Sequence, residues 1–229
     1  MASLDQVPYT ASANPFDATE FSDNPQQRCP CLLLLDTSGS MQGQPIAQLN
    51  AGIRTFKEEL MSDSLAAKRV EVSILTFGPP QSLGPFQTAD AFTPPHLDTT
   101  GDTPMGAAIL QGIAMIEDRK RIYQEHGILY NRPWIFLITD GAPTDNVKLA
   151  SQMLKEGVER KKFAFFAVGV EGADMARLSQ ISPRPPQKLQ GLKFRELFQW
   201  LSNSLSTASR SSPDTERLAL PSPTGWAEL

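Results

Sequence analysis

Three observations predict an α/β fold for this chain. Two segments, 31–35 and 134–139, are apolar at nearly every position, which is typical of strands buried on both faces of a parallel sheet. Stretches with apolar residues at helical spacing follow the predicted strands. Both apolar segments also end at an aspartate beside small or hydroxyl residues, as at the carboxyl edge of an open sheet. We therefore expect a doubly wound, mostly parallel, Rossmann-like sheet with one antiparallel edge strand and helices on both faces.

The first half of the chain supplies the predicted central strand and two long helices. After the strand at 31–35, apolar residues recur at helical spacing over 44–60, and Pro45 is tolerated in the first turn of a helix. Alternating apolar residues predict a strand over 70–77, and 81–87 is expected to add the short antiparallel edge strand. A proline-rich loop, 79–95, precedes a helix predicted over 104–125.

The second half continues the alternation of strands and helices. The strand at 134–139 leads through a glycine turn to a helix over 147–158. A strand at 163–170, a short helix at 174–180 and a short strand at 186–189 follow. The segment 194–205 has the apolar spacing of a closing amphipathic helix.

The chain is predicted to form one domain with an extension at each end. A length of 229 residues suits a single core. We expect an N-terminal arm over 1–26, the domain over 27–206, and a C-terminal tail rich in Ser, Thr and Pro over 207–229. Two interpretations of the tail stay open: it is disordered, or it docks on the domain through Trp226.

Bulk properties exclude several classes of protein. A formal charge of −4 argues against a nucleic-acid-binding surface, and no apolar run approaches the ~20 residues of a membrane span. The first 24 residues do not resemble a secretory signal, so we expect a cytoplasmic protein. Cys29 and Cys31 lie two apart on a predicted strand and point to the same face, which favours two core thiols over a disulfide.

Oxygen-bearing side chains follow two of the predicted strands. Asp36, Ser38 and Ser40 come directly after the first apolar strand, and Asp140 follows the strand at 134–139. Thr103 lies in a turn before the helix at 104–125. Strands of an open sheet present their carboxyl ends at one edge, so these residues can share a crevice. Hard oxygen donors of this kind suit Mg²⁺ or Mn²⁺.

The pattern Asp-x-Ser-x-Ser, then Thr, then Asp, resembles that of the von Willebrand factor A (VWA) domain. The resemblance covers roughly residues 27–206 and implies the VWA fold. It also implies a metal-ion-dependent adhesion site, or MIDAS, made by Asp36, Ser38, Ser40, Thr103 and Asp140. Further segments resemble the bacterial TerY/YegL-like proteins of tellurite-resistance gene clusters; they are Thr76-Phe77-Gly78, Phe92-Thr93-Pro94-Pro95 and Gly225-Trp226.

This resemblance implies a non-enzymatic adaptor. In such a protein the cation at the MIDAS accepts an Asp or Glu side chain of a partner protein. The TerY-like group implies work beside a Ser/Thr kinase and a PP2C-type phosphatase, in a stress-response setting.

Plainer interpretations of the same residues remain. Ser38 and Ser40 could cap the following helix, and Asp36 and Asp140 could be ordinary turn residues. Asp102 is expected to be a solvated turn carboxylate, and Asp145 an early residue of the next helix. A structural cation is the alternative to a partner-binding one, and metal-dependent phosphoester hydrolysis is a weaker alternative because no general base is evident.

Overall fold

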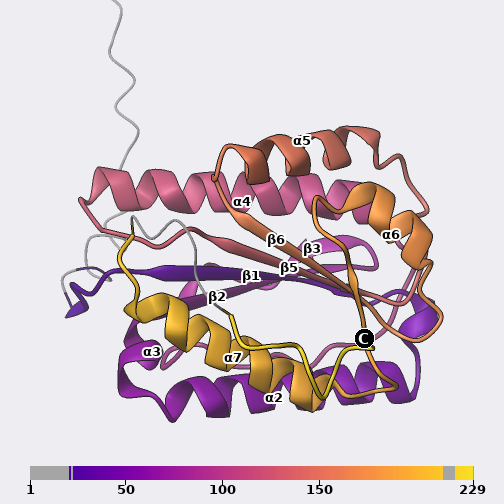
Figure 1. The fold of residues 1–229 in the computed structure, drawn as a ribbon, viewed down its shortest axis with the longest axis horizontal. Helices are drawn as coiled ribbons and strands as arrows, with labels where there is room; N and C mark the ends of the chain where they lie inside the picture. Colours follow the sequence, from indigo (N-terminus) through magenta and orange to yellow (C-terminus); the bar gives the residue numbers. More distant parts are fainter. Residues whose placement is uncertain (1–20, 22, 214–219, 229) are drawn as a thin grey trace, which may run out of the picture.

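The computed structural model describes residues 21, 23–213 and 220–228, and Figure 1 shows their fold. Seven strands form one sheet in the order β3-β2-β1-β5-β6-β7, with β4 also pairing with β2. Their bounds are β1 Cys29–Asp36, β2 Val70–Phe77, β3 Pro80–Ser82, β4 Gln87–Thr88, β5 Trp134–Thr139, β6 Ala164–Gly169 and β7 Gln187–Lys188. β1, β2, β5, β6 and β7 are parallel, whereas β3 and β4 run antiparallel to β2. The predicted fold class is confirmed, and its antiparallel edge consists of two short strands.

Helices cover both faces of this sheet. On one face lie α2 (Gln44–Met61), α3 (Ser64–Arg69) and α7 (Phe194–Arg210), and on the other lie α4 (Met105–Glu125), α5 (Lys148–Glu159) and α6 (Met175–Ile181) (Figure 1). A short 3₁₀ helix, η1 (Gly39–Met41), links β1 to α2. α3 was not predicted, because its six residues are too few for a periodic pattern. Asp63 caps it by accepting hydrogen bonds from the backbone N–H groups of Leu65 and Ala66.

The central strand β1 is buried along its whole length. Leu33 and Leu35 pack into the core beneath α2 and α7, and Leu32 and Leu34 into the core beneath α4 and α5. This division explains why β1 is apolar at consecutive positions. Cys29 and Cys31 are free buried thiols, as expected, and burial together with the nearby Glu71 raises the pKa of Cys29 to about 12.

A buried ionic network ties the amino ends of these strands to α4. The Glu71 carboxylate on β2 accepts hydrogen bonds from Arg28, Arg119 and Tyr123. The Nε atoms of both arginines lie 2.8 Å from the Glu71 carboxylate oxygens. The network lies at the amino ends of the strands, whereas Asp36 lies at the carboxyl end of β1, so the network takes no part in the site described below.

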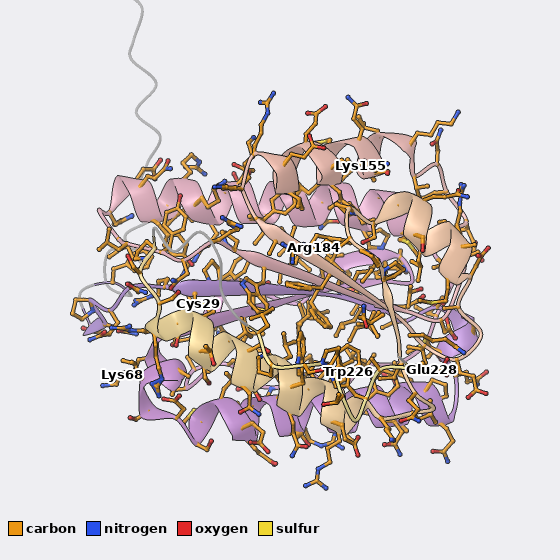
Figure 2. All side chains as sticks on the ribbon, viewed as in Figure 1. Cys29, Lys68, Lys155, Arg184, Trp226 and Glu228 are labelled. Carbon is orange, nitrogen blue, oxygen red and sulfur yellow. The ribbon has the colours of Figure 1, made fainter. Side chains whose placement is uncertain are left out.

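The described part of the C-terminal segment, 220–228, docks on the domain. The Trp226 side chain is 2% exposed and lies on the α7 side of the sheet (Figure 2). The Gln190 N–H donates to the Trp226 carbonyl at 2.7 Å, and Leu189 forms an antiparallel bridge with Ala227. For these residues the docked interpretation of the tail is confirmed. Residues 214–219 and 229, and the predicted arm apart from 21 and 23–26, lie outside the described residues, and the division into arm, domain and tail stays a prediction.

Candidate metal site

The sheet order places the two predicted carboxylates side by side. β1 pairs with β2 on one side and with β5 on the other, so the strand order reverses between β1 and β5. Asp36 is the last residue of β1, and Asp140 directly follows β5. Ligands of open α/β sheets bind outside the carboxyl ends of the strands at such a reversal.

Asp36 is held rigidly at the base of the site. Its side chain is fully buried, and one carboxylate oxygen accepts the Ser38 backbone N–H at 2.9 Å. The other oxygen accepts the Thr139 hydroxyl at 2.5 Å. Thr139 was missed as a functional residue because, as the last residue of an apolar strand, it looks like an ordinary strand position. The only signal for it was its place directly before Asp140.

A chain of hydroxyl contacts joins the β1 loop to Asp140. The hydroxyl oxygens of Ser38 and Ser40 lie 3.0 Å apart, and Ser40 donates to the Asp140 carboxylate at 2.7 Å. Neither serine hydroxyl caps a helix, because Ser38 makes no side-chain cap to η1 and the N-cap of α2 is Gly43. The capping interpretation of these serines is therefore wrong.

Thr103 approaches from a third loop. Its side chain is 6% exposed, and a Cβ on Gly141 would lie 3.2 Å from its hydroxyl oxygen. The loop is tied to the β1 loop, since Gly39 N–H donates to Gly101 at 3.1 Å and Thr100 N–H donates to Thr37 at 2.7 Å. The structure thus joins Asp36, Ser38, Ser40 and Asp140 through hydrogen bonds at one place, and sets Thr103 beside the residue that follows Asp140.

The two carboxylates make the site acidic. Burial raises the pKa of Asp36, and the nearby Asp140 carboxylate raises it further, against hydrogen bonds from Ser38 and Thr139. Burial also raises the pKa of Asp140, against the hydrogen bond from Ser40. Among the described residues, no Lys, Arg or His pairs with either carboxylate.

The donor set consists of oxygen atoms, which suit a hard divalent cation better than a soft one. Two carboxylates offset a double positive charge, and three hydroxyls add neutral oxygen donors. Within the described part of the chain, no three or more His, Cys, Asp or Glu residues gather as in a carboxylate-rich or thiolate metal cluster. The predicted site contains only two acidic ligands, Asp36 and Asp140, because its other three predicted ligands are Ser and Thr hydroxyls.

Two nearby aspartates have different roles. Asp102 is exposed, as expected for a solvated turn residue. Asp145 lies outside α5, contrary to expectation, and its carboxylate accepts the backbone N–H groups of Gly106 and Ala107 at 2.9 and 2.8 Å. It therefore binds the first turn of α4, the helix that Thr103 precedes.

Comparison with known proteins gives the same fold. The sequence model of the von Willebrand factor type A domain matches residues 32–195. A search of curated proteins found no match. No helix within the described ranges is long and apolar enough to cross a membrane.

Solved structures with this fold come from varied proteins. The pilus adhesin SpaC from Lactobacillus rhamnosus GG, in its open conformation, aligns with a TM-score of 0.62 at 14% identity, covering 79% of this chain and 30% of the adhesin. Proximal thread matrix protein 1 from the mussel byssus aligns with a TM-score of 0.54 at 14% identity, covering 79% and 48%. The SpRpn10 VWA domain aligns with a TM-score of 0.50 at 14% identity, covering 67% and 80%. The chain thus spans less than half of the adhesin and of the byssus protein, and the likeness concerns the fold.

Proposed function

Because the chain belongs to the von Willebrand factor type A domain family, we propose that it is a metal-dependent protein-binding adaptor. In this proposal Asp36, Ser38, Ser40, Thr103 and Asp140 hold one Mg²⁺ or Mn²⁺. The cation then accepts an Asp or Glu side chain of a partner protein. Domains of this family commonly mediate protein interactions, which supports the general role.

The observation that carries the proposal is a buried carboxylate, Asp36, near a half-buried one, Asp140, with no basic partner for either among the described residues. Burial raises the pKa of both aspartates, and the Asp140 carboxylate at the strand reversal raises the pKa of Asp36 further. The serine hydroxyls between them supply further oxygen ligands at hydrogen-bond distance. A bound divalent cation would supply the missing positive charge and an electrophilic position for an incoming carboxylate.

The finer assignment is to a phosphorylation-linked stress system in the cytoplasm. The resemblance to the TerY/YegL-like group supports this assignment, through the segments around Phe77, Phe92 and Trp226. We propose that the chain itself is non-enzymatic and binds a Ser/Thr kinase, a PP2C-type phosphatase, or both.

Calorimetric titration with Mg²⁺ and Mn²⁺ tests the metal site. We expect one cation to bind the wild-type chain, and binding to be lost in the double variant Asp36→Ala with Thr103→Ala. Asp102→Ala is the matched control, because it removes an exposed carboxylate beside the site without touching a predicted ligand. Equal cation binding by the double variant and the wild type would reject the site.

A capture experiment with purified kinase and phosphatase tests the partner. We expect capture in Mg²⁺, its loss in EDTA, and its loss with the double variant. If the cation binds but EDTA leaves capture unchanged, the ion is structural and the adaptor mechanism is wrong.

A further inference from the structure

A cavity of about 330 Å³ lies between the sheet, α7 and the C-terminal segment. Its walls are mainly aromatic and aliphatic, and include Phe136, Phe166, Val168, Trp200, Leu220 and Trp226. Cavities of this size accept small organic molecules. The C-terminal segment forms one wall, so the cavity exists only while that segment is docked.

One cationic side chain belongs to this wall. The Arg184 guanidinium lies 5.2 Å from the centre of the Phe166 ring and is exposed to solvent. Within the described ranges no carboxylate forms an ion pair with it, and no acidic residue lines the cavity. The nearby cation Lys188, by contrast, is neutralised by Glu228 at 2.8 Å.

A hydrogen-bond donor in the same wall also lacks a partner. The Trp226 indole Nε1 is the one buried side-chain nitrogen or oxygen of the described residues with no hydrogen-bond partner. A molecule the size of water does not reach this nitrogen, so it packs against protein atoms and not against the open cavity. Of the charged residues that the structure describes, Arg184 alone lines the cavity, and Figure 2 labels it together with Trp226.

We propose that the cavity binds a small apolar carboxylic acid. Its apolar body packs against the rings of Phe166, Trp200 and Trp226, and its carboxylate pairs with Arg184. A neutral ligand of the same shape binds less tightly, because it gains no charge-assisted hydrogen bond with Arg184. The proposal does not depend on the metal site.

The test compares 2-naphthoate with its neutral analogue 2-naphthalenemethanol on the full chain in EDTA, which removes any metal that would bind the carboxylate elsewhere. Two-dimensional ¹H–¹⁵N NMR follows the three tryptophan indole signals during each titration. We expect naphthoate to shift the Trp200 and Trp226 signals and to bind roughly tenfold more tightly than the alcohol. Arg184→Gln should abolish this preference, whereas Arg195→Gln, an equal loss of charge at an exposed residue outside the cavity, should preserve it.

Three results would overturn the proposal. The first is no indole shift with naphthoate in the folded wild type. The second is equal affinity for the acid and the alcohol. The third is an Arg184→Gln variant that remains folded, as judged by its NMR spectrum, and keeps the preference for the acid.

Discussion

Gly101 lies in the loop that carries Thr103, and two separate features require a glycine at this position. Its φ of +68° favours glycine, and a Cβ at this position would lie 1.8 Å from the Gly78 carbonyl oxygen. Gly127 offers a matched comparison, because its φ is +64° but a Cβ there would meet nothing within 4 Å. We expect Gly127→Ala to lower the free energy of unfolding by about 1 kcal/mol. Gly101→Ala should lower it by about 3 kcal/mol, since the loop must also move.

Urea unfolding of both variants, with Mg²⁺ titration of each, measures the two effects. Gly101→Ala should also weaken Mg²⁺ binding, because the displaced loop carries Thr103, whereas Gly127→Ala should leave it unchanged. Equal losses of stability in the two variants would show that the contact with Gly78 is unimportant.

The sequence predicted which candidate site residues lie together, but not the contacts that hold their loops. Asp36, Ser38, Ser40 and Asp140 could be predicted because each follows an apolar strand, and strand ends share one edge of the sheet. The close approach of Gly101 to Gly78 could not be predicted from the sequence, because it joins two loops that meet only in the folded chain.

At the scale of elements, Asp145 couples the loop after β5 to α4. Its carboxylate accepts two N–H groups of the first turn of that helix, next to Thr103. Asp145→Ala should lower the free energy of unfolding by about 1–2 kcal/mol, as for loss of a charged helix cap, and should weaken Mg²⁺ binding. Thermal unfolding and Mg²⁺ titration measure both effects. Asp102→Ala removes an exposed charge beside the same site and should change stability little; a matching loss there would point to general electrostatics instead of the cap.

Most elements were predicted, including the short α6 and β7, whereas α3 and the long-range contacts of Asp145 were not. The strand at 134–139 and the helices now labelled α2 and α4 were predicted nearly to the residue, because their apolar patterns are long. Asp145 was assigned to the start of a helix because sequence shows local neighbours, whereas its partners at 106 and 107 are almost forty residues away. The six-residue α3 lacks enough turns to produce a period.

At the scale of the whole molecule, the C-terminal segment completes the face of the sheet that α7 leaves open. Phe166 on β6 is only partly buried, and Trp200 on α7 contacts the Trp226 ring, with centroids 5.3 Å apart. Trp200 also donates its indole N–H to the Pro221 carbonyl at 2.9 Å. A Ser/Thr/Pro-rich composition alone indicates disorder, so only Trp226 hinted at docking. What composition does not show is that one buried tryptophan can hold such a segment in place.

Replacing Trp226 separates its packing from its hydrogen-bonding capacity. Trp226→Ala should lower the free energy of unfolding by about 3–5 kcal/mol, because it empties a site that is 2% exposed. Trp226→Phe should cost less than about 1.5 kcal/mol, since it keeps an aromatic ring and removes an N–H that has no partner. Circular dichroism during guanidinium unfolding measures both without relying on tryptophan fluorescence. A Trp226→Ala variant as stable as the wild type would show that the segment contributes nothing to the fold, whereas a large loss with Trp226→Phe would show that the indole N–H is satisfied in solution.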